Sequence, residues 1–272
     1  MDINVNLKDV KLGVIGCGKM ASAILGGVVK NNFINPDNIF VFDINENSSN
    51  FLSEKYGFNF SDSIENLLKC CNVVLLAVKP FVVNEVLLEI QKNYSNQLIV
   101  SILAGVKLDK YTNYLPKASV VRVMPNTPAL VNLGMSAICK SEKTTHAEEK
   151  FLFELMKNCG EVIKTTEDKI DIITALSGSG PAFYFRIIDL MAKSAQKLGL
   201  DYKQALILSA QTALGSAKMI FENDFDVERL IANVTTPGGC TEVGNTVLNN
   251  SNIDEILNKT IKDTMEKAIK LG

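Results

Sequence analysis

Two glycines and an alanine follow a short apolar segment near the start of the chain. An apolar segment at 12–15 is followed by Gly16, Cys17, Gly18, Lys19, Met20 and Ala21, and Ala21 also begins an amphipathic segment at 21–30. A strand, a tight glycine turn and a helix start in this order are typical of a dinucleotide-binding βα unit. The second glycine lets backbone N–H groups approach a pyrophosphate, and the helix N-terminus offers unpaired N–H groups and partial positive charge. The motif alone is weak evidence, because glycine turns are common.

Asp43 ends the next expected strand, where a dinucleotide fold faces the adenosine ribose. A carboxylate there can bind the 2′-hydroxyl and would repel a 2′-phosphate. No arginine lies nearby, although Asn45, Asn47 and Ser48 are polar. This pattern favours NADH without excluding NADPH. A turn-initiating aspartate is the alternative interpretation.

Three more segments follow expected strands, at the edge where open α/β sheets bind their ligands. They contain Ala77, Val78, Lys79 and Pro80; Ile102, Leu103 and Ala104; and the loop 124–128, with Asn126 between two prolines. The prolines stop the strands and stiffen the loop. Each fragment by itself is equally well explained as a strand end or a turn.

Two glycine-rich segments precede expected helices in the second half of the chain. Residues 177–181 read Ser-Gly-Ser-Gly-Pro, and residues 236–241 read Thr-Pro-Gly-Gly-Cys-Thr. Gly238, Gly239 and the following helix start predict a nest of N–H groups suited to a carboxylate. Thr241 adds a hydroxyl that could meet an imine or amine nitrogen. Capped helix starts would explain part of this pattern.

Composition excludes several classes of function. His146 is the only histidine, and the six cysteines form no C-x-x-C pair, which argues against a histidine-dependent triad, a zinc site or a thioredoxin-like site. The net charge of −2 provides no basic field for nucleic acid or an anionic membrane. No apolar segment approaches the ~20 residues of a membrane span. Residues 1–10 lack the apolar core of a signal peptide, so we expect a cytoplasmic protein.

The expected secondary structure, which must position these residues, changes near residue 165 from alternating strands and helices to helices alone. The first part alternates apolar segments with helical patterns, which predicts an α/β doubly wound, mostly parallel sheet. Its expected strands are 11–15, 39–43, 73–78, 98–102, 120–124, 135–139 and 161–164, and its expected helices are 21–30, 48–56, 63–70, 84–92 and 147–158. The rest is predicted to be all helical, at 181–198, 202–222, 227–234, 242–249 and 253–270. The helix at 202–222 is apolar over more than one face, which favours an oligomer interface.

Taken together, the motifs resemble the pyrroline-5-carboxylate reductase family. They are G-C-G-K-M-A, A-V-K-P, M-P-N-T-P, S-G-S-G-P and T-P-G-G-C-T, in this order and spacing, and the likeness runs from Leu12 almost to the end of the chain. The resemblance implies a Rossmann-like dinucleotide-binding domain at 1–165 and an all-helical dimerisation and substrate domain at 166–272. It implies a homo-oligomer, with a dimer through the helical domain and a decamer as a larger assembly. The implied reaction is the NADPH- or NADH-dependent reduction of a small-molecule substrate, 1-pyrroline-5-carboxylate, to L-proline.

The resemblance also implies roles for individual residues. It implies substrate contacts for Glu167, Gly238, Gly239, Cys240 and Thr241, with Thr241 near the ring nitrogen. It places cofactor contacts at the residues of the glycine turn, at the strand ends and at Asn233. Two positions depart from the family. Cys240 stands where Thr or Ala is usual, and Ile64 replaces an Asn that contacts the cofactor in many relatives.

Two other functions fit parts of the pattern. A β-hydroxyacid or other cyclic-imine reductase could share the two-domain plan, and a hydroxyacid enzyme would need a helical lysine such as Lys193 or Lys197 as a proton donor. A catalytically silent dinucleotide sensor would keep the glycine turn but would not need the loop at 236–241. A cyclic imine is easier to explain with one histidine, since a protonated imine is already electrophilic.

Overall fold

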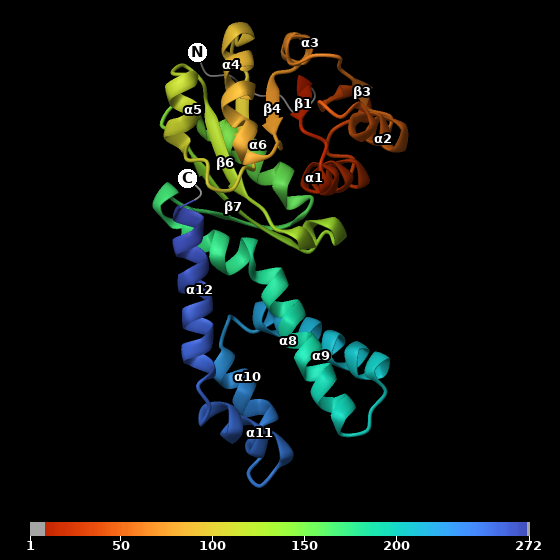
Figure 1. The fold of residues 1–272 in the computed structure, drawn as a ribbon, viewed down its shortest axis with the longest axis vertical. Coiled ribbons are helices and arrows are strands. Elements are labelled where there is room, and N and C mark those ends of the chain that lie inside the picture. The colour runs from red at the N-terminus through yellow and green to blue at the C-terminus, as the bar shows by residue number, and fades with distance from the viewer. Residues whose placement is uncertain (1–8, 271–272) are drawn as a thin grey trace. The chain divides into compact units, whose positions relative to one another are not determined.

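The structure divides into two compact units. It is a computed structural model that describes residues 9–270; the first residues, which the sequence predicts to lack a signal segment, lie outside that range. One unit comprises the chain up to Ser179 together with the residues from Thr264 onward, and the other comprises Gly180–Asp263. Figure 1 shows the strands in the first unit and the long helices α8 to α11 in the second. Within the described residues no helix has the length and apolar character needed to span a bilayer.

The first unit is built on one eight-stranded sheet with the order β3-β2-β1-β4-β5-β6-β7-β8. The strands are β1 (Leu12–Ile15), β2 (Ile39–Phe42), β3 (Asn59–Phe60), β4 (Val73–Leu76), β5 (Leu98–Ser101), β6 (Val120–Met124), β7 (Gly134–Lys140) and β8 (Gly160–Lys164). Every neighbouring pair is parallel except β6 and β7. The sheet confirms the predicted doubly wound α/β fold, and β3 is the strand that the sequence did not reveal.

The order of the strands reverses beside β1. The chain moves from β1 to β2 and β3 on one side and then crosses to β4 on the other side. Leu12 and Ile15 of β1 pair with Ile39 and Phe42 in one direction and with Val73 and Leu76 in the other. Loops that leave the carboxyl ends of β1, β2 and β4 therefore diverge and open a crevice. Such a switch point is where open α/β sheets bind ligands.

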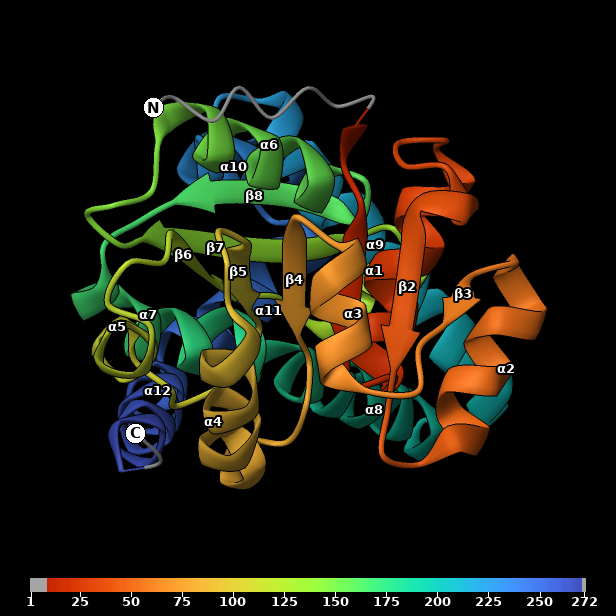
Figure 2. The same cartoon turned by 90° about the horizontal axis from the view of Figure 1, so that it is seen from above.

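Helices cover both faces of the sheet, as Figure 2 shows. Ala21 to Val28 of α1 pack with Leu152 and Met156 of α6 on one face, whereas Leu67 of α3 and Leu87 of α4 pack on the other. β1, β4, β5 and β6 are buried along their full length because both faces are covered. The main helices of this unit are α1 (Lys19–Lys30), α2 (Glu46–Tyr56), α3 (Ile64–Cys70), α4 (Val83–Asn93), α5 (Leu108–Tyr114) and α6 (His146–Lys157).

The segment after β8 belongs to the first unit. It forms short helical turns, including η5 (Glu167–Lys169) and α7 (Ile170–Ile173), and it precedes the break at Gly180. Ile170 is fully buried in a small cluster with Met124, and Asn126 donates a hydrogen bond to the Ser177 carbonyl. The predicted domain boundary between residues 165 and 166 thus lies before the point where the chain leaves the sheet unit.

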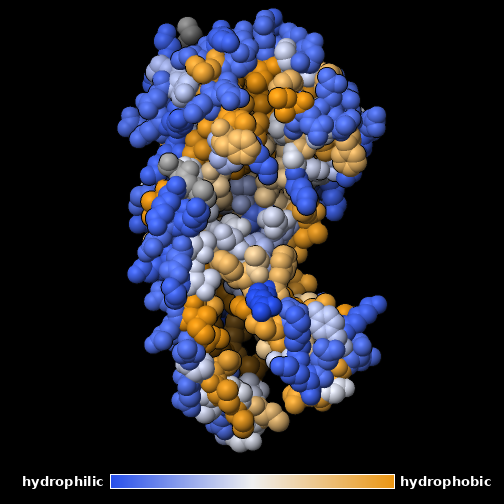
Figure 3. Space-filling model, viewed as in Figure 1, coloured by the Kyte–Doolittle hydropathy of each residue, from blue (hydrophilic) through white to orange (hydrophobic). Residues whose placement is uncertain are grey.

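The second unit has almost no core of its own. It contains α8 (Gly180–Lys197), α9 (Tyr202–Glu222), α10 (Val227–Val234), α11 (Cys240–Asn249) and the first part of α12 (Ile253–Ile269). Only Gly180, Ala192 and Ala205 are buried between Gly180 and Asp263, while large apolar side chains such as Phe185, Met191 and Phe221 are exposed. Figure 3 shows several apolar patches on the surface of this unit. So much exposed apolar surface is typical of an interface that another subunit covers.

Candidate active site

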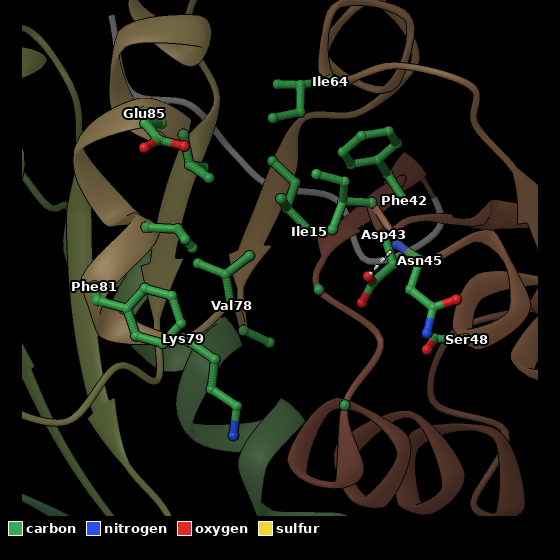
Figure 4. Close-up of a pocket in the computed structure, with 16 residues that line it drawn as sticks. Ile15, Phe42, Asp43, Asn45, Ser48, Ile64, Val78, Lys79, Phe81 and Glu85 are labelled. Carbon is green, nitrogen blue, oxygen red and sulfur yellow. Dashed lines mark hydrogen bonds between the residues drawn. The ribbon is translucent and has the colours of Figure 1, made fainter.

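A cavity of about 600 Å³ lies at the switch point of the sheet. Loops after β1, β2 and β4 form its walls, and the first turns of α4 and its preceding 3-10 turn close one side. Figure 4 shows residues from these elements lining the cavity from both sides. The lining residues are Ile15, Gly16, Gly18, Phe42, Asp43, Ile44, Asn45, Ser48, Ile64, Ala77, Val78, Lys79, Phe81, Val82, Glu85 and Val86. The volume falls within the usual range for a small-molecule site.

Glycine is favoured at two positions of the turn after β1 for different physical reasons. Gly16 has φ of +98°, and a Cβ atom there would lie 2.7 Å from the Ala77 carbonyl carbon. Gly18 has φ of −74°, which any residue can adopt, and a Cβ atom there would meet nothing within 4 Å. Gly16 is therefore required by the fold, whereas Gly18 keeps space open beside the cavity that it lines. That open space is a cradle that a side chain would fill.

The start of α1 supplies free hydrogen-bond donors. Gly18 is the N-cap, no side chain caps the helix, and the first turn contains no acidic residue. Within the described part of the chain, the backbone N–H groups of Lys19 and Met20 make no hydrogen bond, while Ser22 begins the ladder by donating to the Gly18 carbonyl at 2.9 Å. An uncapped helix start at a glycine turn binds anions through its N–H groups and the helix dipole. The arrangement suits a pyrophosphate.

Asp43 joins the two loops on one side of the cavity. Its Oδ2 atom accepts a hydrogen bond from the Cys17 N–H at 2.6 Å, and its Oδ1 atom accepts one from the Asn45 N–H at 2.8 Å. The Cys17 side chain points inward and is buried, and burial together with the Asp43 charge raises the pKa of its thiol to about 12. Cys17 is therefore a protonated packing residue, and its backbone N–H is the part that serves the site.

The structure brings some of the predicted cofactor residues together and leaves others apart. Gly16, Gly18, Asp43, Ala77, Val78 and Lys79 line the cavity. Pro80 instead lines a neighbouring hollow of about 640 Å³. Ile102 to Ala104 follow β5 at the same edge of the sheet without lining the cavity, and the Leu103 side chain is buried in the core.

The Asn126 side chain is occupied by contacts within the protein. Its amide group donates to the Ser177 carbonyl at 3.2 Å and to the Ser177 hydroxyl at 3.3 Å, and its Oδ1 atom accepts from the Met135 N–H at 2.8 Å. The side chain therefore fixes the loop after β6 to the segment that leads to α8. Its predicted cofactor contact remains a prediction.

Sequence reasoning missed Phe81. This ring lines both hollows and is 83% exposed, although large aromatic side chains normally bury most of their surface. Pro80, in the segment that follows β4, begins a 3-10 turn, and this turn places Phe81 at the rim of the cavity. An aromatic residue directly after the proline that follows an apolar strand segment, at the ligand edge of the sheet, was the available signal.

The loop at 236–241 of the second unit begins α11 without a side-chain cap. Gly238 has φ of +73°, and Gly239 is the N-cap. The Gly238 N–H donates to the Glu242 carboxylate at 2.8 Å, and the Gly239 N–H donates to the Thr236 carbonyl at 2.9 Å. Within the described residues the N–H groups of Cys240 and Thr241 have no hydrogen-bond acceptor. The free donors of the predicted nest are thus those of Cys240 and Thr241, since the two glycines are already engaged.

Other predicted residues of the second unit are accessible. Thr241, Cys240 and, in α10, Asn233 are all exposed. Lys193, a candidate proton donor for hydroxyacid chemistry, forms an exposed ion pair with Asp189 at 2.7 Å. The Asp189 carboxylate holds that ammonium group on the surface of α8.

Glu167 lies in the first unit, where it is bound by three groups. Its carboxylate pairs with the Arg122 guanidinium at 2.7 Å, accepts from the Leu108 N–H at 3.1 Å and accepts from the Cys139 thiol at 3.0 Å. The Glu167 side chain retains 29% exposure. The structure therefore gives Glu167 a structural role that the sequence did not indicate, beside its predicted substrate contact.

Comparisons with known proteins agree with this geometry. Residues 167–271 match the family model for pyrroline-5-carboxylate reductase dimerisation, and residues 11–105 match the model for NADP oxidoreductase, coenzyme F420-dependent. The pyrroline-5-carboxylate reductase of Methanosarcina acetivorans is 35% identical over 98% of this chain and 99% of its own. The structure of a pyrroline-5-carboxylate reductase from Coxiella burnetii has a TM-score of 0.91 at 33% identity, covering 98% and 99% of the two chains. The Plasmodium falciparum pyrroline carboxylate reductase with NADP bound has a TM-score of 0.87 at 29% identity, covering 98% and 100%.

Proposed function

The chain belongs to the pyrroline-5-carboxylate reductase family, and we propose on this premise how its residues divide the work of that reaction. The protein is an oxidoreductase that reduces 1-pyrroline-5-carboxylate to L-proline with NADH or NADPH, the last step of proline biosynthesis. The observation that carries this assignment is the cavity at the switch point, with an uncapped glycine turn and helix start on its wall.

The residues around the cavity fit a dinucleotide. The open space beside Gly18 leaves room for a pyrophosphate, and the N–H groups of Lys19 and Met20 are the donors that would hold it. Asp43 is the acceptor for a ribose hydroxyl, and the Ala77 to Lys79 segment forms the opposite wall. When bound, the dinucleotide supplies the hydride. We assign further contacts with the cofactor, outside the cavity lining, to six residues. They are the backbones of Pro80, Ile102, Leu103 and Ala104, together with Asn126 and Asn233.

The start of α11 supplies the groups that the substrate needs. The free N–H groups of Cys240 and Thr241, supported by the dipole of this helix, bind the substrate carboxylate. Gly238 and Gly239 contribute by shaping the turn, because their own N–H groups are engaged. The replacement of a threonine or alanine by Cys240 leaves its backbone donor intact.

Thr241 is the residue that contacts the reacting bond. The ring nitrogen of a protonated cyclic imine carries an N–H that can donate to the Thr241 hydroxyl oxygen. This hydrogen bond orients the C=N bond and favours the protonated form, which is the form that accepts a hydride at carbon. The proton stays on nitrogen and becomes the amine proton of the product, so no further protein acid is required.

The helical unit assembles the protein. The chain forms a homo-oligomer, as the match to the dimerisation family and the exposed apolar side chains of the helices indicate. We assign the dimer contact to the helical part of the chain from residue 166 onward, with the cofactor part at 1–165, and we propose a decamer as the complete assembly. We place the enzyme in the cytoplasm, because all six cysteines are free thiols, as expected in a reducing compartment.

The assay that tests this function follows the absorbance of NADH and NADPH with pyrroline-5-carboxylate and, separately, with 3-hydroxyacids and the oxidised cofactors. We expect oxidation of a reduced cofactor with the cyclic imine only, and L-proline as the product by mass spectrometry. Binding of a dinucleotide without any turnover of the imine would favour a sensor. Turnover of a 3-hydroxyacid would favour the other dehydrogenase class.

A further inference from the structure

We propose that Asp43, held against the glycine turn at the rim of the cavity, makes this chain selective for NADH over NADPH. This inference rests on the proposed function, because it concerns the cofactor of the same reaction. It goes beyond family membership, since one relative of this chain has NADP bound. The proposal is carried by the anchoring of the Asp43 carboxylate and by the charges that line the cavity.

The Asp43 carboxylate is fixed by two backbone donors. The Cys17 N–H lies 2.6 Å from Oδ2, and the Asn45 N–H lies 2.8 Å from Oδ1. The bond from Cys17 joins Asp43 to the loop after β1, and the bond from Asn45 holds it within its own loop after β2, so the side chain cannot rotate away without breaking one of them. Figure 4 shows Asp43 beside Asn45 on one wall of the cavity, with their hydrogen bond drawn.

The anchored carboxylate still has capacity to accept hydrogen bonds. A carboxylate offers about four lone-pair directions, and two of them are used by Cys17 and Asn45. The remaining directions suit the hydroxyl groups of an unmodified ribose, which donate. A 2′-phosphate has no proton to donate at neutral pH and would bring a second negative charge to a fixed one.

The rest of this wall offers nothing to neutralise a 2′-phosphate. The residues that follow Asp43 on the rim are Ile44, which is 94% exposed, and the uncharged Asn45 and Ser48. Among the lining residues the charged groups are Asp43, Glu85 and Lys79. Figure 4 shows Lys79 on the other side of the cavity from Asp43. NADPH-binding sites of this fold instead place an arginine near the 2′-phosphate.

The test measures binding directly, by calorimetric titration of the intact protein with NADH and with NADPH at low salt. We expect NADH to bind at least about tenfold more tightly, because the repulsion acts at short range with little screening. Asp43→Ser should reduce this ratio by about tenfold through weaker NADH binding and stronger NADPH binding. Ile44→Arg keeps the Asp43 anchor and adds a cation at the rim, so it should strengthen NADPH binding alone.

Glu46→Gln is the matched control. Glu46 is an exposed carboxylate three positions after Asp43, and it does not line the cavity. Its loss should therefore leave the ratio of NADH to NADPH affinity unchanged. Equal or tighter binding of NADPH by the unaltered protein would overturn the inference and leave the proposed function standing. An equal change of the ratio in Glu46→Gln and Asp43→Ser would overturn the role of Asp43. A protein that binds neither dinucleotide would overturn the proposed function itself.

Discussion

The guanidinium group of Arg122, on β6, lies 2.7 Å from the carboxylate of Glu167, in the segment after β8. Arg122 is 1% exposed, so this ion pair is closed to solvent on the arginine side. Its Nε and Nη2 atoms make no hydrogen bond to any residue that the structure describes. Glu167 is therefore the acceptor that compensates a buried positive charge, and it ties the segment leading to α8 onto the sheet.

Glu167→Gln should destabilise the protein by about 3 kcal/mol, because it leaves the Arg122 charge buried without a counter-charge. Chemical unfolding monitored by circular dichroism would measure this loss. The control is Glu65→Gln, which removes an exposed ion pair with Lys69 at 2.5 Å and should change the free energy of unfolding by less than about 1 kcal/mol. A Glu167→Gln protein with unchanged stability and a raised KM would assign Glu167 to the substrate alone.

Gly16→Ala and Gly18→Ala should separate folding from cofactor binding. At Gly16 the positive φ and the 2.7 Å approach to Ala77 should cost about 2–4 kcal/mol of stability. At Gly18 the new methyl group meets no protein atom, so stability should fall by about 1 kcal/mol or less while dinucleotide affinity falls about tenfold. Thermal unfolding and calorimetric titration of both variants measure the two effects. Equal losses of stability would show that Gly18 serves the fold as Gly16 does.

Thr241→Ala should lower kcat/KM for pyrroline-5-carboxylate by about tenfold or more, the cost of a lost hydrogen bond to a charged group. Thr241→Ser keeps the hydroxyl and should restore most of the activity. Thr246→Ala is the control on the same helix, because the Thr246 hydroxyl only donates to the Glu242 carbonyl at 2.8 Å. Unchanged kcat and KM in Thr241→Ala would remove Thr241 from the reaction.

Buried thiols should make the protein less stable above pH 9. Burial raises the pKa of Cys159 from 9.0 to about 11. Between these pH values the folded chain keeps the thiol proton and the unfolded chain loses it. The stability that this thiol contributes is therefore fully present below pH 9 and is lost as the pH rises toward 11. Each such thiol contributes a slope on the order of 1 kcal/mol per pH unit.

Urea unfolding at pH 8, 9 and 10 would measure this slope. Cys159→Ala should flatten the fall in stability with pH, whatever its effect on stability at pH 8. The exposed Cys70 is the control position, and Cys70→Ala should leave the slope unchanged. Equal slopes for the unaltered protein and Cys159→Ala would contradict the assignment of a raised pKa to this thiol.

Strong hydrophobic patterns explain why most of the fold was predictable. The all-apolar segments at β1 and β4 and the helices α9 and α10 were predicted within a few residues, because continuous apolar segments and apolar residues at helical spacing are visible in the sequence itself. β3 was missed, since it has two residues and both are exposed. α5 was also missed, because Tyr111 is the single buried residue in its seven. The antiparallel pairing of β7 with β6 has no local signature.

The residues of the cofactor site followed from motif order, but their roles depended on contacts that no motif records. The sequence indicates that Gly16, Gly18 and Asp43 belong to one site. It does not indicate that Asp43 holds the Cys17 N–H, or that Phe81 reaches the same cavity. These relations join different loops, so they depend on the register of β1, β2 and β4.

By itself the sequence determined the order of most strands and helices along the chain, the glycine turn at the ligand edge and the family to which the chain belongs. These follow from local periodicity and from residue types at fixed spacing. Tertiary structure alone decided which backbone donors of the loop at 236–241 are free. The Gly238 N–H donates to the Glu242 carboxylate, whereas the N–H groups of Cys240 and Thr241 have no acceptor among the described residues. It also decided that Glu167 compensates Arg122. Hydrogen bonds and charge pairing depend on positions in space to within a few tenths of an ångström, and spacing along the chain does not specify those positions.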